Sequence, residues 1–342
     1  MTLISMINGH GRPLIISDRA VSERNTLNTV ILSTTNKETF SPTPVADFNV
    51  KTLIIQDILC VTFCGNLAIL EQIHADITDF FLYREVSTIT LNEFLLSNEY
   101  GPGCSLLFAM GGPEFPDQMF VLKVGEWIHE NNPENIDVLS CGSGAADWTS
   151  YLMQKLNYLN DEEQSYQSSL QTILSTCMAF LTLERKSTQN LKNGWGGGFD
   201  VVCFQDGKFQ RFNDITYIFF KFDYSKPGLP AALSVIHNSY INGDAVVRHL
   251  TETGSEIYHF PQLNNKIPVT GLDLNCSSKN VITCVHLFNG EQFHTDLGVM
   301  FWDTNPESEP TIYTTRHNGE FAVKFRDVYI KQVRIAISLF LN

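Results

Sequence analysis

The sequence predicts an α+β protein with two units: a first domain over residues 1–225 and an additional C-terminal, mainly-β domain over residues 226–342. In the first domain, blocks of strand patterns and helix patterns are joined mostly by hairpin signals. This order favours mixed sheets with separate helical layers over a parallel, doubly wound sheet. Past the Pro-Gly-Leu-Pro stretch at 227–230, the pattern changes to short alternating runs separated by turn residues. A length of 342 residues accommodates both units.

The first domain opens with strands and continues with helices. Strands are predicted in hairpin-like pairs at 2–7 with 13–18 and at 50–57 with 58–65. Apolar residues at helical spacing then predict a helix over 67–81, and a short helix follows near 91–98. The remaining strands are expected at 104–112, 118–125 and 136–144 and, after helices at 145–158 and 164–184, at 199–212 and 216–223.

The C-terminal domain is expected to consist almost entirely of short strands. Alternating apolar and polar residues predict them at 255–260, 281–288, 298–303, 311–317, 320–325 and 328–341. One early helix is predicted at 244–252, from the run Asp-Ala-Val-Val-Arg-His-Leu-Thr-Glu. This composition is typical of a binding or assembly module.

The composition argues against several classes of protein. The formal net charge is −14 and no cluster of Lys or Arg occurs, so we expect no binding to nucleic acid or to anionic membranes. No stretch approaches the length of a membrane span, and the N-terminus lacks a signal-peptide pattern, which predicts a cytoplasmic protein. The eight cysteines lie mostly in apolar runs without a CxxC pair, which indicates small core residues rather than disulfides or zinc ligands.

The sequence predicts neither a cofactor nor a metal site. Six of the nine histidines fall within 226–342, at spacings that match no metal-binding motif, so scattered surface histidines are the simpler interpretation. Trp195, Trp302 and the 24 phenylalanines are most simply explained as core residues.

Six positions of the first domain are candidates for a catalytic site: Thr2, Asp18, Lys51, Gly65, Ser143 and Asn193. Asp18 ends the second predicted strand, sixteen residues after Thr2. Lys51 begins a long apolar run, and Gly65 closes that run fourteen residues later. Two glycine motifs follow, Cys-Gly-Ser-Gly around Ser143 and Asn-Gly-Trp-Gly-Gly-Gly from Asn193.

Taken singly, each of these positions also has a plain structural explanation. Asp18 and Arg19 would be turn residues at a strand end, and Lys51 would be a solvated strand start. Gly65 would let the chain turn into a helix that Asn66 caps. The glycine motifs would be tight turns where backbones approach closely.

Taken together, the six positions resemble the proteasome β-subunit family of N-terminal nucleophile hydrolases, which includes the bacterial HslV peptidase. The resemblance covers about residues 2–222 and implies the family's four-layer αββα sandwich. It also implies a threonine-type peptidase or amidohydrolase, in which removal of Met1 exposes Thr2. The substrate would be an amide, in a peptide or in another molecule.

The resemblance implies a role for each candidate residue. Thr2 would be the nucleophile and its own amine the base, because a threonine hydroxyl is a poor nucleophile at neutral pH. Lys51 would lower the pKa of that amine, and Asp18 would hold the Lys51 ammonium in place. The backbone N–H of Gly65 would stabilise the oxyanion, and Ser143 would hydrogen-bond the amine.

The chain also departs from the family pattern. The family's Asp-x-x-Ser-Gly-Gly motif corresponds here to Asn193 followed by Gly196 and two more glycines, so a carboxylate and a hydroxyl are missing. The alternative to an enzyme is therefore a non-catalytic, proteasome-like scaffold whose C-terminal domain mediates binding or assembly.

The sequence gives only general expectations about binding partners and substrate specificity. Family members commonly stack into rings, so the resemblance implies a homo-oligomer, as a ring or in another form. Whether an ATPase partner exists is left open. Specificity would depend on segments 20–50 and 98–118, which match no known pattern.

Overall fold

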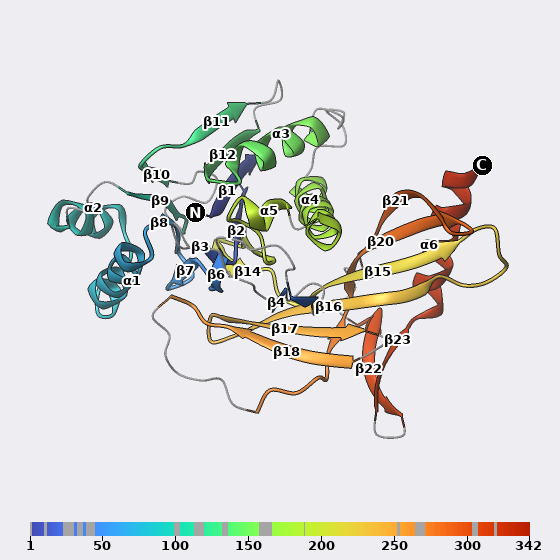
Figure 1. The fold of residues 1–342 in the computed structure, drawn as a ribbon. Helices are drawn as coiled ribbons and strands as arrows, with labels where there is room; N and C mark the ends of the chain where they lie inside the picture. The colour runs from blue at the N-terminus through green and yellow to red at the C-terminus, as the bar shows by residue number, and fades with distance from the viewer. Residues whose placement is uncertain are drawn as a thin grey trace.

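The computed structural model shows a mixed α/β protein in which nearly all strand pairs are antiparallel (Figure 1). No described helix is both long and apolar enough to span a membrane. The structure describes residues 2–9, 12–22, 31–32, 37–38, 45–98, 103–112, 120–131, 136–156, 166–187, 189–251, 254–263, 271–302, 307–317 and 320–342.

The N-terminal strand lies in the middle of a six-stranded antiparallel sheet, in the order β11-β12-β1-β2-β13-β14. The strands are β1 (Leu3–Gly9), β2 (Arg12–Asp18), β11 (Ile128–Asn131), β12 (Asp137–Gly142), β13 (Phe199–Gln205) and β14 (Lys208–Arg211). Leu3 pairs with Gly142 of β12, and Ile4 pairs with Ser17 of β2. Thr2, just before β1, therefore lies where β2 and β12 both end.

A second antiparallel sheet, in the order β10-β9-β8-β7, packs against the first. Its strands are β7 (Thr52–Ile55), β8 (Leu59–Gly65), β9 (Cys104–Met110) and β10 (Phe120–Val124). Successive side chains of a strand point to opposite faces, so every second residue enters the space between the sheets. Met6 and Ile15 of the first sheet there share one apolar cluster with Cys60, Leu107 and Ala109 of the second.

Helices pack on the other faces of both sheets. They are α1 (Leu67–Phe81), α2 (Thr88–Ser97), α3 (Ala145–Leu156), α4 (Tyr166–Ser187) and the single turn α5 (Gln189–Lys192). Leu70, Ile73 and Ile77 lie on one face of α1 and share a core with the second sheet. Trp148 of α3 and Ile173 of α4 share a core with the first sheet. The helices α1 to α4 form close to the ranges that the sequence predicts, whereas the single turn α5 was not predicted.

The C-terminal part is built on a third sheet, in the order β18-β17-β16-β15-β20-β21. Its strands are β15 (Ile215–Asp223), β16 (Ala231–Ile241), β17 (Asp244–Thr251), β18 (Gly254–Phe260), β20 (Asn280–Asn289) and β21 (Gln292–Phe301). β15 pairs parallel to β20 and antiparallel to β16. The run at 216–223, which the sequence assigned to the first domain, thus belongs to the second unit. The break between the units lies near 212–214 rather than at 225.

β15 contributes to two cores, and this explains why its sheet was misassigned. Tyr217 and Phe219 belong to the same core as Trp148 of the first domain. Ile218 and Phe220 belong to the core beneath the C-terminal helix. A strand that is buried on both faces has a continuous apolar sequence, which does not reveal the sheet it will join.

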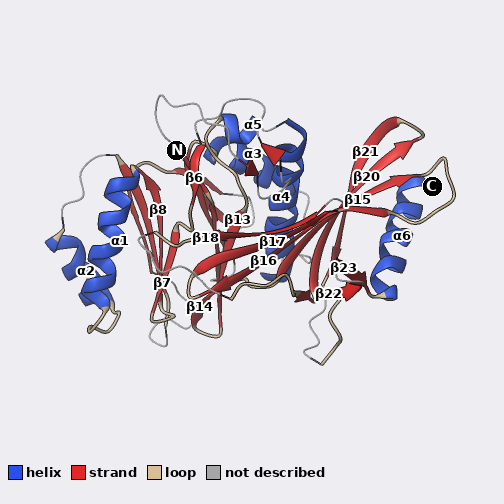
Figure 2. Cartoon of the chain, turned by 60° about the horizontal axis from the view of Figure 1, so that its bottom comes forward, coloured by secondary structure: helices blue, strands red, loops and turns tan. Residues whose placement is uncertain are grey.

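The third sheet is covered on one face by α6 (Asp327–Leu341) and by a small sheet. The small sheet consists of β19 (Ser277–Ser278), β22 (Ile312–His317) and β23 (Glu320–Phe325). Figure 2 shows α6 at the opposite end of the molecule from α1 and α2. Two short strand pairs follow β2, formed by β3 (Ala20–Ser22) with β6 (Val45–Phe48) and β4 (Ile31–Leu32) with β5 (Lys37–Glu38).

The helix predicted at 244–252 is wrong, because residues 244–251 of this run form β17. The turn before it, Asn242-Gly243, has positive φ values of 51° and 90°, which suit a two-residue hairpin loop. Residues 244–250 are all buried, so the sequence shows no alternation that would distinguish a strand from a buried helix.

The strand predicted at 328–341 is also wrong, because this run forms α6. Tyr329, Val333 and Ile337 are spaced four residues apart, lie on one helical face and are buried in the core of the third sheet. Several β-branched residues in the run made it resemble a strand. Packing against the sheet overrides that weak preference.

The predictions for cysteine and tryptophan can be compared directly with the structure. All eight cysteines are free and six are buried, which confirms their interpretation as core residues. Trp195 is buried as well. Trp302 is half-buried and stacks on Phe212, with the ring centroids 5.1 Å apart.

The prediction of surface histidines is wrong for His237, His249 and His286, which are buried in the third sheet. His237 Nδ1 lies 3.0 Å from the hydroxyl of Thr216, and His249 Nε2 lies 2.7 Å from the hydroxyl of Ser234. Burial lowers the pKa of His237 to about 3 and that of His249 to about 4. Both imidazoles are therefore neutral at neutral pH.

We expect the free energy of unfolding to fall as the pH decreases from about 6.5 towards about 4. In the unfolded chain, His237 and His249 would titrate near their ordinary pKa of 6.5, whereas the folded values are lower. As the pH falls, the unfolded chain binds these protons before the folded protein does. The stabilisation is therefore complete above the unfolded pKa of 6.5 and is lost as the pH falls towards the folded values. Urea unfolding at several pH values measures the effect. The double variant His237→Gln/His249→Gln should depend less on pH, and an unchanged dependence would contradict the prediction.

Candidate functional site

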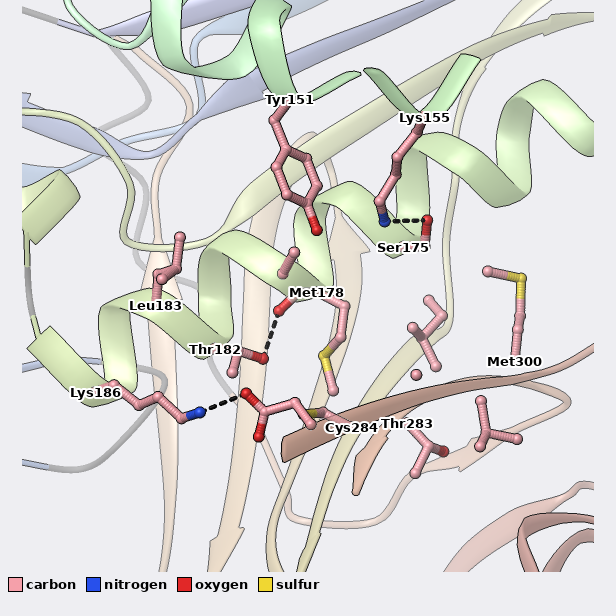
Figure 3. Close-up of a pocket in the computed structure, with 15 residues that line it drawn as sticks. Tyr151, Lys155, Ser175, Met178, Thr182, Leu183, Lys186, Thr283, Cys284 and Met300 are labelled. Carbon is pink, nitrogen blue, oxygen red and sulfur yellow. Dashed lines mark hydrogen bonds and ion pairs between the residues drawn. The ribbon is translucent and has the colours of Figure 1, made fainter. Parts of the chain in front are cut away.

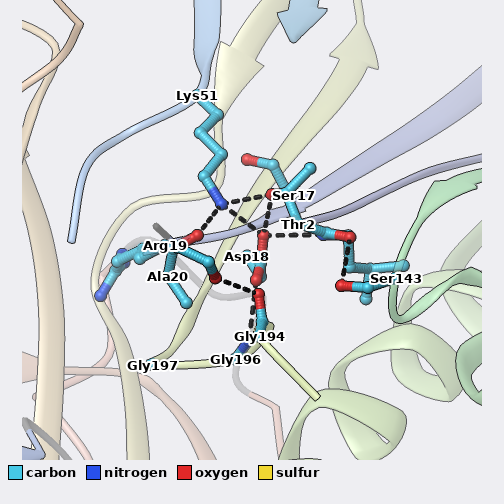
Figure 4. Close-up of polar contacts among 12 residues, drawn as sticks. Thr2, Ser17, Asp18, Arg19, Ala20, Lys51, Ser143, Gly194, Gly196 and Gly197 are labelled. Carbon is cyan, nitrogen blue, oxygen red and sulfur yellow. Dashed lines mark hydrogen bonds and ion pairs between the residues drawn. The ribbon is translucent and has the colours of Figure 1, made fainter. Parts of the chain in front are cut away.

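Three of the six candidate residues meet in one buried group (Figure 4). Asp18 Oδ1 accepts a hydrogen bond from the hydroxyl of Thr2 and lies 2.7 Å from Lys51 Nζ. The Lys51 ammonium also donates to the hydroxyl oxygen of Thr2 and to the carbonyl oxygen of Ala20. Thr2, Asp18 and Lys51 are 2%, 0% and 3% exposed, so the group is shielded from solvent.

The strand register explains how residues so far apart in sequence meet. Thr2 precedes β1, and Asp18 ends the neighbouring β2, while the N–H of Leu3 also donates to Asp18 Oδ1 at 2.9 Å. Lys51 precedes β7 in the second sheet, where its carbonyl oxygen accepts from the N–H of Phe63 at 3.1 Å. The ammonium thus reaches the first sheet from the second.

The electrostatics of this group favour a reactive hydroxyl. The Asp18 carboxylate and the Lys51 ammonium balance each other, so the buried group as a whole is neutral. The ammonium lies directly against the hydroxyl oxygen of Thr2. A positive charge at that position stabilises the negative charge that develops when the hydroxyl attacks a carbonyl group.

Gly65 lies at the same site. A small cavity of about 20 Å³ is lined by Thr2, Val21, Ser22, Lys51, Gly65, Leu67, Leu70 and Leu263. Gly65 has a φ of +135°, and a Cβ atom there would lie 2.2 Å from the carbonyl oxygen of Gly103. Only glycine suits this position, where β8 ends and the N-cap of α1, Asn66, follows.

Ser143 also lies beside Thr2, but it contacts a different atom from the one that the resemblance implies. Its hydroxyl donates to the carbonyl oxygen of Thr2 at 3.4 Å, and the N–H of Gly144 reaches the same oxygen at 3.4 Å. A Cβ atom at Gly142 would lie 2.0 Å from that oxygen. The Gly-Ser-Gly motif therefore holds the backbone of Thr2 rather than its amine.

Asn193 does not join the group, which corrects its inclusion among the site residues. Its side chain is exposed, and its N–H donates to the carbonyl oxygen of Gln189 at 3.1 Å. The N–H of Gly196 lies at the site instead, donating to Asp18 Oδ2 at 2.7 Å. Asn193 lies in the turn that ends α5, and the chain reaches Asp18 only at Gly196.

A buried glutamate explains why glycine occupies position 196. Glu184 is fully buried and accepts from the N–H of Gly197 and from the side-chain amide of Asn190, both at 2.9 Å. A Cβ atom at Gly196 would lie 2.5 Å from the Glu184 carboxylate. A serine would therefore not fit here. The sequence signal that was missed is a glutamate three residues after Leu181, on the buried face of α4.

A second buried ion pair lies next to the site, at the residue that follows Asp18. The sequence did not predict this pair. Arg19 Nη2 lies 2.7 Å from Asp200 Oδ1, and the hydroxyl of Tyr240 donates to the same oxygen at 2.6 Å. Burial, the largest single effect, would lower the pKa of Arg19, but the charge of Asp200, Tyr240 and the hydrogen bonds of both together outweigh it and raise the pKa above its ordinary value. The backbone N–H of Arg19 contacts the carbonyl oxygens of Gly196 and Gly198, both at 3.2 Å.

The second unit also contributes to the wall of the cavity. Pro261 accepts from the N–H of Val50 at 3.0 Å, and the side chain of Gln262 donates to the carbonyl oxygen of Thr52 at 2.9 Å. Leu263 follows, is 2% exposed and lines the cavity beside Thr2. The segment 261–263 thus lies against the strand that carries Lys51.

One group among the described residues has the donor set of a metal site. The ligand atoms of Cys284, His286 and Asp296 lie within 4.8 Å of one another. The ammonium of Lys186 already binds Asp296, and burial raises the pKa of the Cys284 thiol to about 11, so this thiol stays protonated. The geometry favours a hydrogen-bonded group over a cation site.

Much of the two segments expected to set specificity lies outside the described residues. These parts are 23–30, 33–36, 39–44, 99–102 and 113–118. No family model matches the chain, and no curated protein matches its sequence.

Proposed function

We propose that the protein is an N-terminal-threonine hydrolase of the proteasome β-subunit type, which cleaves an amide bond after removal of Met1. One observation carries this proposal: the hydroxyl of Thr2 contacts both the Lys51 ammonium and the Asp18 carboxylate within a buried group. The family's αββα sandwich is part of the proposal. It is supported by two facing sheets with α1 and α2 on one side and α3 and α4 on the other.

In the proposed reaction, the free amine of Thr2 accepts the proton of its own hydroxyl. The hydroxyl oxygen attacks the carbonyl carbon of the substrate, and the N–H of Gly65 stabilises the resulting oxyanion. The proton then passes from the Thr2 ammonium to the leaving amine as the carbon–nitrogen bond breaks. Water, activated by the same amine, finally hydrolyses the ester on Thr2.

Lys51 and Asp18 would act on the charge at the reacting oxygen. The Lys51 ammonium favours the deprotonated hydroxyl, because it attracts the negative oxygen, and it favours the neutral amine, because it repels the protonated one. Asp18 fixes the ammonium through the 2.7 Å ion pair. The carboxylate in turn is held by the N–H groups of Leu3 and Gly196.

Intact mass and covalent labelling test the proposal together. The purified protein should lack the mass of Met1, and a peptide vinyl sulfone should form one adduct that peptide mapping places on Thr2. Full retention of Met1, or an adduct elsewhere with Thr2 unmodified, would overturn the mechanism. Size-exclusion chromatography with light scattering tests the homo-oligomer that the resemblance implies.

The small cavity beside Thr2 favours a second candidate, the non-catalytic scaffold. A volume of about 20 Å³ holds no more than about one water molecule, and Leu263 of the second unit forms part of its wall. In that case the third sheet and α6 would carry the binding function. A protein that lacks Met1 but resists labelling and hydrolyses no amide panel would support this alternative.

Leu263→Ala is expected to raise the rate of Thr2 labelling several-fold, because it removes one wall of the cavity. The variant should also lose about 2–5 kcal/mol of stability, as expected for a buried leucine. Leu91→Ala is the matched control, since Leu91 lies in the same core but does not line the cavity. Quenching the labelling reaction at several times and measuring the adduct by mass spectrometry gives the rates. Equal rates in both variants would show that Leu263 does not limit access.

The location and partners complete the proposal. Eight free thiols support a reducing compartment, and we take this to be the cytoplasm. The substrate would be a peptide or another amide. An ATPase partner would show itself as nucleotide-dependent hydrolysis in cell extract that the purified chain lacks.

A further inference from the structure

A second cavity, of about 480 Å³, lies between the helices of the first domain and the third sheet (Figure 3). This volume is within the range of small-molecule sites. One wall is a single face of α4, where Ser175, Met178, Thr182 and Lys186 follow helical spacing. α3 contributes Tyr151 and Lys155, and the opposite wall comes from β20 and β21.

The sheet side of this cavity is open because a glycine lies in β21. Gly298 lines the cavity, and a Cβ atom there would meet no heavy atom within 4 Å. Met300, two residues further along β21 and therefore on the same face, also lines the cavity, opposite Met178 of α4. Most of the wall is therefore apolar.

Lys155 places a positively charged side chain in this mostly apolar wall. It is half-buried, donates to the hydroxyl of Ser175 at 3.1 Å and lies 4.9 Å from the ring centroid of Tyr151. No carboxylate among the described residues lies within ion-pair distance of its ammonium. Lys186, by contrast, is already paired with Asp296.

The environment of Lys155 has an energetic consequence. Burial lowers the pKa of Lys155, which shows that its positive charge is poorly solvated. In a chain with a formal net charge of −14, a partly buried lysine that has no acidic partner among the described residues is unusual. An anion bound in the cavity would supply that partner. The hydroxyl of Ser175 already donates to the carbonyl oxygen of Thr172 at 2.8 Å, so the Lys155 ammonium is the donor for the anion.

We propose that this cavity binds a small amphipathic carboxylate, with its carboxylate on Lys155 and its apolar body along the methionine-lined wall. The site is separate from Thr2 and requires no chemistry there. A carboxylate offsets the buried ammonium, whereas a neutral alcohol of the same length would gain only the apolar contacts. A cationic analogue would be repelled by Lys155, whereas the charge of Lys186 is balanced by Asp296.

Isothermal titration calorimetry of the full chain with octanoate tests the proposal. We expect one saturable site for octanoate. Octan-1-ol should bind with an affinity at least about tenfold lower, and octylammonium should not bind. Absence of saturable octanoate binding would overturn the proposal. Equal affinity for octan-1-ol would show that the Lys155 ammonium does not bind the carboxylate of the ligand.

Matched variants locate the site. Gly298→Leu should abolish octanoate binding by filling the cavity, whereas Gly254→Leu, at another strand glycine with open space around it, should bind like the parent. Lys155→Met keeps the length of the side chain and should weaken octanoate by about tenfold without affecting octan-1-ol. Undiminished octanoate binding in folded Gly298→Leu would place the ligand elsewhere and refute the assignment. Thr2→Ala should bind octanoate normally, which separates this proposal from the hydrolase.

Discussion

Thr2→Ala is expected to abolish vinyl sulfone labelling and to reduce amide hydrolysis by about a thousandfold or more. The variant removes the oxygen that contacts both Lys51 and Asp18, and no described neighbour offers a replacement hydroxyl at that position. The fold should tolerate the change, because Asp18 keeps its bonds to Leu3 and Gly196. Initial rates on a panel of fluorogenic peptide amides, with labelling on the same samples, measure the effect.

Two further variants distinguish the role of the Thr2 hydroxyl as nucleophile from the role of the Lys51 charge. Thr2→Ser keeps the hydroxyl and should retain labelling at a reduced rate, since the missing methyl group leaves the side chain freer to rotate. Lys51→Met removes the ammonium but not the nucleophile, and it should lose activity while Met1 is still removed. If Thr2→Ala hydrolyses amides as fast as the parent protein, Thr2 is not the nucleophile, and any activity belongs to another site.

Arg19→Met should destabilise the protein by about 3–5 kcal/mol, the loss expected when one partner of a buried ion pair is removed. Asp200 would then be left in the core with a single described donor, the hydroxyl of Tyr240. Its second oxygen already lacks a partner among the described residues. Arg19 also bonds Asn238 of β16 at 3.1 Å, so the variant weakens the junction between the first domain and the third sheet.

A surface ion pair provides the matched control for Arg19. Arg84 lies 3.5 Å from Glu93, with both side chains about half exposed, so Arg84→Met should cost less than about 1 kcal/mol. Adding Asp200→Asn to Arg19→Met should restore part of the loss, because it removes the unpaired charge. Urea unfolding followed by circular dichroism gives all three values. A loss for Arg19→Met no larger than that for Arg84→Met would contradict the argument.

The elements of the first domain were largely predictable because local patterns and tertiary packing agree there. α1, α3 and α4 each present an apolar face at helical spacing, and the paired strands are bounded by turn residues. The C-terminal unit was harder. β17 is buried on both faces and α6 is rich in β-branched residues, so in each case the packing partner decides between helix and strand.

The candidate site was predictable where chemistry constrains residue type and spacing. The sequence places Thr2, Asp18, Lys51 and Gly65 at or beside the ends of predicted strands, and the structure brings these strand ends together. Asn193 was included by the same reasoning, but it lies in an exposed turn. Glu184 was missed: its place on the buried face of α4 was the only sequence signal, and the N–H groups that bind its carboxylate are visible only in the structure.

The sequence by itself determined which residues carry polar chemistry at the ends of the first strands, and which runs of the first domain are helices or strands. Only the tertiary structure decided that Glu184 excludes a side chain at Gly196, that Arg19 pairs with Asp200, and that Leu263 reaches the cavity beside Thr2. The physical reason is the range of the interactions. In the first domain, secondary structure follows mainly from neighbours a few residues apart. Buried charges, cavity walls and the secondary structure of β17 and α6 depend on contacts between elements that the sequence separates widely.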